Sequence, residues 1–184
     1  MTDKIKVGLI FGGNSSEYEV SIMSAHNIYE EIDTNKFDVY PMWITNDGYL
    51  DDDADSRKVL DNPKMEVANP HKVANISNII ELKDRPEIDV FFPIVHGNLG
   101  EDGCLQGLFR VLDKPFVGDD VLAAAVTMDK EMTKILAQRA GVPVAKWIAV
   151  KRFEYNDPDN EKLDYEYVAS QLGSDLFVKP SNQG

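Results

Sequence analysis

A loop of eight residues, His-Gly-Asn-Leu-Gly-Glu-Asp-Gly at positions 96–103, carries the side chains best suited to chemistry in this chain. It follows an apolar run, residues 91–95, that is typical of a strand covered on both faces of a parallel sheet. Such sheets bind ligands at the carboxyl ends of their strands. His96 could hydrogen-bond or polarise a carboxylate or acyl oxygen there, and Gly97 would let the backbone approach a ligand closely. We predict a ligand site at this loop, the alternative for His96 being a structural hydrogen-bonding role.

Two acidic residues lie at the end of this loop, and a cysteine follows it. Glu101 and Asp102 precede a predicted helix that starts near Gly103, so we expect them to cap its free amides. Cys104 follows at the helix start, where an exposed thiol would be activated. Because no second catalytic group accompanies it, we favour a small buried cysteine beneath the loop.

A second turn, residues 12–17, lies between a predicted strand and a predicted helix. Free amides and the helix dipole favour an anion there, but the turn lacks the glycine spacing of a dinucleotide site. Glu17 would repel a pyrophosphate and attract an ammonium group. The alternative is that Glu17 only complements the helix N-terminus, where Ser16 and Glu19 have the spacing of a capping box.

Two lysines stand beside turns in this otherwise acidic chain. Lys130 opens a predicted helix, and Lys179 ends an apolar run. Together they could neutralise phosphate oxygens, whereas either lysine alone is more often solvated surface.

Hydrophobic periodicity predicts the elements that position these residues. Strands are expected at residues 4–11, 37–44, 89–95, 115–118, 147–150 and 175–179, with Pro41 at an edge or bulge. Helices are expected at residues 17–32, 105–112, 129–140 and 165–172, whereas 51–55 is interpreted as an acidic surface stretch. This order predicts a doubly wound α/β domain over residues 1–119 and an α+β region over residues 120–184.

Composition narrows the class of protein. With 184 residues and a net charge of −13, the chain is suited to a globular core but not to a nucleic-acid or anionic membrane surface. A single cysteine excludes an intramolecular disulfide, and no cysteine and histidine cluster has zinc-ligand spacing. No apolar run is long enough to cross a bilayer. We expect a cytoplasmic protein without its own metal site.

Five motifs together resemble the D-alanine–D-alanine ligase family. They occupy residues 12–21, 96–103, 105–107, 128–130 and 178–181, in the order and spacing of that family, and span essentially the whole chain. The combination is far more specific than any single motif. Two departures, Asp119-Asp120 where relatives often have Gly-Ser and Arg110 where they commonly have Glu, bear on subgroup and not on reaction.

The resemblance implies a Rossmann-like (pre-ATP-grasp) substrate-binding domain followed by the start of an α+β ATP-grasp domain. It also implies a peptidoglycan-synthesis enzyme that phosphorylates the carboxylate of one D-alanine and lets the amine of a second displace phosphate. The chain ends inside the family's glycine- and serine-containing loop, which predicts an N-terminal fragment that is inactive alone. Its Mg²⁺ ligands are expected in the C-terminal half.

The resemblance also assigns roles to single residues. Glu17 is expected to bind the ammonium group of the first D-alanine, and His96 to lie beside its carboxylate and the acyl phosphate. Ser21 and Gly97 complete the expected substrate-binding set; Lys130 and Lys179 are the expected contacts to ATP phosphates. A homodimer is expected. The alternatives are a D-alanine–D-lactate ligase, another ATP-grasp carboxylate-amine ligase, or, for this chain alone, a non-catalytic amino-acid-binding or dimerisation module.

Overall fold

The computed structural model describes residues 4–51, 53–64, 82–157 and 159–183. The chain divides into two compact units, residues 1–125 and residues 126–183, within helix α4 (Val121–Met128). We describe each unit by itself. The predicted domain boundary after residue 119 lies a few residues before this division and stays a prediction.

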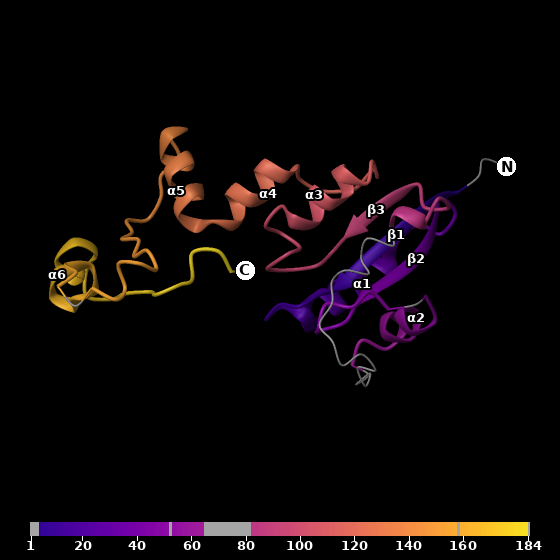
Figure 1. Ribbon diagram of the computed structural model, residues 1–184, viewed down its shortest axis with the longest axis horizontal. Coiled ribbons are helices and arrows are strands. Elements are labelled where there is room, and N and C mark those ends of the chain that lie inside the picture. The colour runs from indigo at the N-terminus through magenta and orange to yellow at the C-terminus, as the bar shows by residue number, and fades with distance from the viewer. Residues whose placement is uncertain (1–3, 52, 65–81, 158, 184) are drawn as a thin grey trace. The chain divides into compact units, whose positions relative to one another are not determined.

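The first unit is built on a three-stranded parallel sheet (Figure 1). Its strands are β1 (Ile5–Gly12), β2 (Phe37–Ile44) and β3 (Val90–Pro93), in the order β2-β1-β3. The predicted α/β class with a parallel sheet is confirmed for this unit. Strand β2 pairs only with β1 among the described strands, so Pro41 lies on an edge strand as expected.

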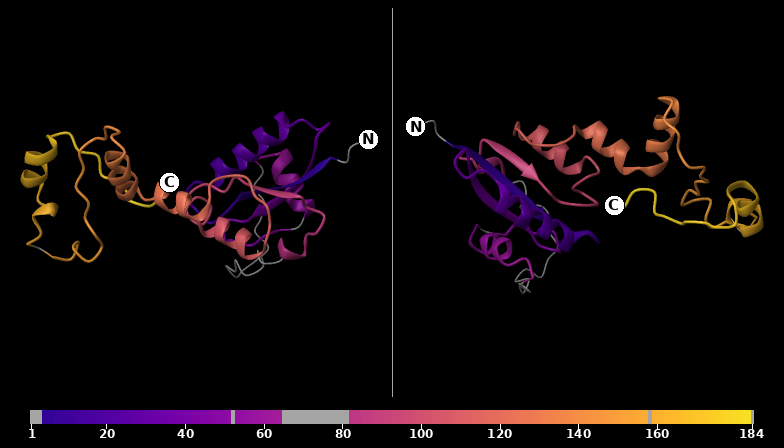
Figure 2. Two further views of the ribbon diagram at one scale, coloured as in Figure 1. Left: turned by 90° about the horizontal axis from the view of Figure 1, so that it is seen from above. Right: turned by 180° about the vertical axis from the view of Figure 1, so that it is seen from behind.

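Helices cover both faces of this sheet, with α1 (Tyr18–Glu31) and α3 (Cys104–Val111) on opposite sides of the strands (Figure 2). Alternate residues of β1 point to opposite faces: Leu9 and Phe11 pack with the α1 side, whereas Ile10 packs with the α3 side. Because both faces are covered, β1 is an almost unbroken apolar run.

Each face has its own buried cluster. The cluster on the α1 side consists of Leu9, Phe11, Ile22, Ala25, Val39, Trp43, Val59 and Leu60. The cluster on the α3 side consists of Ile10, Met42, Ile44, Leu82, Ile88, Phe91, Val95, Leu105 and Phe109. In the second cluster Phe109 stacks between Phe91 and Phe116, at centroid distances of 5.3 and 5.4 Å. The predicted brief strand at 115–118 is reduced to one parallel bridge, between Phe116 and Phe91.

Helix α2 (Asp53–Asp61) was not predicted, because its sequence was interpreted as an acidic surface stretch. Its buried residues, Ser56, Val59 and Leu60, recur at helical spacing and pack toward β2. The Ser56 hydroxyl accepts a hydrogen bond from the backbone amide of Trp43 at 2.8 Å. Asp55 and Asp61 of this helix are not among its buried residues.

The second unit contains α5 (Lys130–Arg139), a 3₁₀ turn η2 (Glu161–Leu163) and α6 (Tyr165–Leu172). The two predicted helices are confirmed, but the predicted strands at 147–150 and 175–179 are wrong, since neither segment is paired. An isolated extended segment leaves its backbone groups without partners, so periodicity alone does not make a strand. Phe177 and Val178 are 91% and 97% exposed.

None of the helices in the described ranges is both long and apolar enough to cross a bilayer. The two sequence departures from the resembled family contact each other: Arg110 forms an exposed ion pair with Asp120 at 2.9 Å. Asp120 also accepts a hydrogen bond from the amide of Val121, at the start of α4.

Candidate functional site

The two loops singled out from the sequence meet at the carboxyl ends of the neighbouring strands β1 and β3. Ser15, in the turn after β1, joins them: its hydroxyl donates to the carbonyl of His96 at 2.8 Å and accepts from the amide of Glu17 at 3.1 Å. The adjacency of the strands explains the meeting, because parallel neighbours end at the same edge of a sheet.

Glu17 has a buried carboxylate oxygen at this edge of the sheet. It is the N-cap residue of α1, yet its side chain makes no capping hydrogen bond, so the predicted capping box of Ser16 and Glu19 is wrong. Its Oε2 atom is buried and accepts no hydrogen bond from any residue in the described ranges. A buried carboxylate oxygen without a donor is costly, and such an atom is ready to accept from a ligand.

Gly97 lies directly against this carboxylate. A Cβ atom at residue 97 would stand 3.0 Å from Glu17 Oε2, and the backbone there has a positive φ of 74°. Any side chain would therefore be strained and would crowd the carboxylate. The sequence-based expectation that Gly97 permits close approach agrees with this geometry.

The imidazole of His96 is held between α1 and its own loop. Its Nε2 atom lies 3.1 Å from the hydroxyl of Ser24, and its Nδ1 atom lies 3.3 Å from Glu101 Oε1. The other Glu101 oxygen accepts from the amide of Gly97 at 2.8 Å. Glu101 was expected to cap α3, but it contacts His96 and Gly97 instead, because the loop folds back over its side chain.

Ser21 was expected to bind substrate, but its hydroxyl is committed to the fold. The residue is fully buried; its Oγ donates to the carbonyl of Ile94 at 2.6 Å and accepts from the amide of Gly12 at 2.8 Å. It thereby fastens the end of β1 to the segment after β3. We assign Ser21 the positioning of both loops in place of direct contact with a ligand.

Asp102 performs the capping role predicted for it. Burial alone would raise the pKa of Asp102, but hydrogen bonds from the amides of Leu99 and Cys104 and from the Cys104 thiol hold that pKa below its ordinary value. The predicted buried position of Cys104 is wrong, since the residue is exposed at the start of α3. Its hydrogen bond to Asp102, burial and the Asp102 charge raise the pKa of this thiol, which opposes nucleophilic chemistry.

Three supporting residues were given no role in the sequence analysis, although Ser15 and Gln106 lie within its motifs. Gln106 on α3 donates from Nε2 to the carbonyl of Gly100 at 2.8 Å and holds the middle of the loop. Ser15 and Ser24 contact His96 as described. Ser24 had a detectable signal, because it lies two helical turns after Glu17 and so on the same face of α1.

The N-terminal turn of α1 is fixed by an aromatic pair. The indole of Trp43 donates to the Tyr18 hydroxyl at 2.8 Å. Burial raises the pKa of the Tyr18 phenol to about 12, against the lowering effect of the Trp43 hydrogen bond. Tyr18 is therefore a neutral, partly buried anchor beside Glu17.

The two predicted phosphate-binding lysines belong to the second unit. The amide of Lys130 donates to the carbonyl of Ser181 at 2.8 Å, and its ammonium group contacts the carbonyl of Gln183. The Ser181 hydroxyl donates to Asp129, the N-cap of α5. These contacts place the segment that follows Lys179 at the N-terminus of α5. Lys179 itself is exposed.

Metal-binding groups of three or more His, Cys, Asp or Glu side chains are absent from the described residues. Two apolar hollows lie in the first unit. One, of about 180 Å³, is adjacent to the site loops and includes Gly13, Val95, Leu99 and Cys104 in its lining. The other, of about 420 Å³, lies toward the amino ends of the strands and is distant in the fold from the His96 loop.

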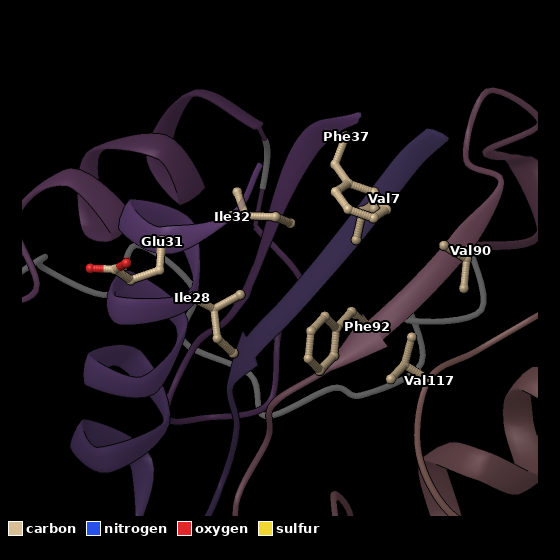
Figure 3. A pocket seen from close by; sticks show the side chains of 8 residues that line it. All are labelled: Val7, Ile28, Glu31, Ile32, Phe37, Val90, Phe92 and Val117. Carbon is tan, nitrogen blue, oxygen red and sulfur yellow. The ribbon is translucent and has the colours of Figure 1, made fainter. Parts of the chain in front are cut away.

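Figure 3 shows this larger groove. Ile28 and Ile32 of α1 face the sheet there, whereas the carboxylate of Glu31 points away from the apolar side chains. The remaining lining residues are Val7, Phe37, Val90, Phe92 and Val117. Glu31 is the one titratable residue of this lining, and because its carboxylate points away, the groove itself presents only apolar side chains.

Comparison with known proteins gives one consistent result. Residues 6–119 match the family model described as the D-ala D-ala ligase N-terminus. The chain is 98% identical, over its full 184 residues, to a D-alanine–D-alanine ligase of Lactobacillus gasseri, but spans 51% of that relative. Other curated relatives that it matches are likewise about twice its length.

Solved structures agree. The D-alanine–D-alanine ligase of Coxiella burnetii superposes with a TM-score of 0.74 at 30% identity, covering 98% of this chain and 54% of that one. The VanG D-Ala:D-Ser ligase of Enterococcus faecalis superposes with a TM-score of 0.65 at 31% identity, covering 99% of this chain and 53% of that one.

Proposed function

Because the chain belongs to the D-alanine–D-alanine ligase N-terminal family, we propose that it supplies the first-substrate side, and part of the ATP site, of an ATP-dependent ligase. The whole enzyme joins two D-alanine molecules for peptidoglycan synthesis. The chain spans about half the length of the relatives it matches, so the remainder of the site belongs to sequence outside these 184 residues.

The observation that carries the proposal is the buried Oε2 atom of Glu17, at the meeting point of the two loops, to which no residue in the described part of the chain donates a hydrogen bond. An ammonium group is the ligand that complements it, because it brings both the missing donor and the opposite charge. Gly97 leaves room for a small amino acid beside this carboxylate. A larger or anionic ligand would gain less from the same atoms.

His96 supplies the second half of the recognition. A D-amino acid whose ammonium group pairs with Glu17 presents its carboxylate toward the His96 side of the edge, because the two loops are fastened together through Ser15. The same imidazole would accompany that carboxylate as it becomes an acyl phosphate. Hydrogen-bond donation to the negative oxygens lowers the barrier to this step.

The proposed reaction has two steps. A carboxylate oxygen of the first D-alanine attacks the γ-phosphorus of ATP, giving D-alanyl phosphate and ADP. The amine of the second D-alanine then attacks the acyl carbon, phosphate leaves, and the amine loses a proton. Lys130 and Lys179 fit the first step as point charges for phosphate oxygens, although Lys130 must exchange its contact with Gln183 for one with ATP.

When bound, Mg²⁺ would supply positive charge to the phosphate groups of ATP. Its preferred ligands are carboxylates, and the described residues hold no suitable cluster. In this proposal its protein ligands belong to the rest of the enzyme, as the family resemblance implies.

Titration of the labelled chain with D-alanine tests the substrate side by NMR. Amide resonances of residues 15–17 and 96–98 should shift on binding. Glu17→Gln should weaken binding about 10- to 100-fold, since it removes the negative charge that strengthens the hydrogen bond to the ammonium group. The matched control is Glu19→Gln, an exposed acid in the first turn of the same helix. Equal weakening by both variants would refute the role of Glu17.

The reaction is tested on the complete gene product that contains this chain. Release of ADP and phosphate should require D-alanine, ATP and Mg²⁺ together, and dialanine should accumulate. Comparison of D-alanine, D-serine and D-lactate as second substrate then separates the ligase subclasses. Absence of ADP release with all three would refute the proposed reaction.

We also propose a cytoplasmic homodimer, on the strength of the family resemblance. The apolar groove in Figure 3 is the surface best suited to a second copy, because its lining is almost wholly hydrophobic. Val117→Lys should lower the mass measured by sedimentation, whereas Val111→Lys, on an 83% exposed residue outside the groove, should not. A dimer that persists in Val117→Lys would place the interface elsewhere.

A further inference from the structure

The carboxylate of Glu101 bridges two different groups of its own loop. Oε2 accepts from the backbone amide of Gly97 at 2.8 Å, and Oε1 lies 3.3 Å from Nδ1 of His96. The His96 and Glu101 side chains are 24% and 44% exposed, so the pair is partly accessible to solvent. On the far side of the ring, Nε2 lies 3.1 Å from the hydroxyl of Ser24.

The chemistry of these partners fixes where the imidazole proton lies. The amide of Gly97 only donates, and an ionised carboxylate only accepts. A hydrogen bond between Glu101 and His96 therefore requires the proton on Nδ1. A neutral ring then has its lone pair on Nε2, so the Ser24 hydroxyl must be the donor to that atom.

We propose that Glu101 is a positioning residue that holds His96 in the Nδ1-protonated tautomer, with Nε2 turned to α1. The significance for D-alanine rests on the proposed function. With the proton of the neutral ring on Nδ1, Nε2 can donate a hydrogen bond to a substrate anion only after it takes a proton from solvent. A second carboxylate thus prepares the histidine, while Glu17 is left to the ammonium group.

The Glu101→Gln variant makes an unusually sharp test, because glutamine has one acceptor and one donor in place of two acceptors. The Gly97 amide requires the acceptor, so the glutamine carbonyl oxygen faces Gly97 and its NH₂ group faces Nδ1. The NH₂ group can only donate, so Nδ1 must become the acceptor. The proton of the neutral ring then moves to Nε2, and the tautomer inverts.

Long-range ¹H–¹⁵N correlation on the histidine-labelled chain at alkaline pH, where imidazole rings are neutral, detects the tautomer directly. The His96 signal is assigned by its loss in His96→Asn. His26 is an internal reference, because its Nδ1 lies 2.8 Å from the carbonyl of Leu60 and must carry its proton. We expect Nδ1–H for His96 in the parent chain and Nε2–H in Glu101→Gln, with His26 unchanged in both.

Two further variants separate the possible causes. Asp102→Asn alters the neighbouring acid, which contacts Leu99 and Cys104 and not His96, so the His96 tautomer should stay as in the parent chain. Ser24→Ala removes the partner of Nε2 and should also leave Nδ1–H in place. Inversion in Ser24→Ala, or Nε2–H in the parent chain, would overturn the proposal, as would an unchanged tautomer in a folded Glu101→Gln.

This result is independent of the proposed function. The tautomer is read without any ligand, so it can invert as expected in a chain that fails to bind D-alanine. In that case the positioning role of Glu101 would stand and the substrate assignment would fail. The opposite pattern, D-alanine binding with an uninverted tautomer in Glu101→Gln, would refute only the role of Glu101.

Discussion

Residues 4–125 and residues 126–183 differ in how their elements are held. Two buried clusters lie on either face of the sheet in the first unit. In the second unit Met128 is the only buried residue among those described, and Phe177 and Val178 are exposed. Helices α5 and α6 instead have acidic N-caps that accept backbone hydrogen bonds. Packing therefore organises the first unit, whereas local capping organises the second.

The largest expected effect comes from the aromatic stack of the first unit. Phe109→Ala removes a fully buried ring that contacts Phe91 and Phe116, and should cost about 3–5 kcal/mol of unfolding free energy. Phe177→Ala, on a 91% exposed ring of the second unit, should change it by less than about 0.5 kcal/mol. Urea unfolding measures both, and similar losses would abolish the contrast between the units.

A smaller loss is expected at the buried junction of the two site loops. Ser21→Ala leaves the Gly12 amide and the Ile94 carbonyl without a buried partner and should cost about 1–3 kcal/mol. The control is Ser170→Ala in the second unit, where an exposed hydroxyl donates to the Tyr167 carbonyl. Chemical denaturation measures both losses of unfolding free energy. An equally small loss in Ser21→Ala and Ser170→Ala would show that the Ser21 hydroxyl does not hold the two loops together.

Capping should matter more for α5 than for α1. Asp129→Ala removes the acceptor for the amides of Glu131 and Met132 and should cost about 1 kcal/mol, seen as faster hydrogen exchange in α5. Asp129→Asn should largely restore protection, because asparagine is an equally good N-cap. Glu17→Ala should leave exchange in α1 unchanged, since Glu17 makes no capping bond. Faster exchange there would show that α1 also depends on its cap.

The smallest effect is a response to acid. Hydrogen bonds hold the pKa of Asp102 below its ordinary value of 3.8, outweighing the effect of burial. A lowered folded-state pKa stabilises the fold at higher pH, and this contribution is lost as the pH falls from about that ordinary value through the folded-state pKa. Asp102→Asn should flatten this part of the stability–pH curve. An unchanged curve would mean that the Asp102 contacts contribute nothing to folding.

The success of the sequence-based predictions also differs between the two units. The strands of the first unit were located within a few residues, because burial on both faces produces long apolar runs. The same reasoning failed at 147–150 and 175–179, because a strand requires a neighbour and none pairs with these segments among the described residues. Helix α2 was missed because its buried residues, Ser56, Val59 and Leu60, lie within an acidic segment.

Within the candidate site, the sequence predicted which residues lie there better than it predicted the role of each one. Glu17, His96 and Gly97 do converge at one edge of the sheet. The Ser21 hydroxyl, expected to face a ligand, is instead buried between Gly12 and Ile94. Glu101, expected to cap a helix, contacts His96. Each polar group has several possible partners, and its choice depends on atoms within about 3 Å that local sequence does not specify.

The sequence by itself determined the fold class, the two loops at the strand ends and the family of the chain, because apolar periodicity and motif spacing are local properties. Only the tertiary structure decided which of the polar side chains are already satisfied and which remain open to a ligand. Ser15 and Ser24 reach His96 from far along the chain, and Ser21 reaches Ile94. The structure also shows that Glu17 Oε2 is buried and accepts no hydrogen bond from the residues it describes, which the local sequence does not reveal.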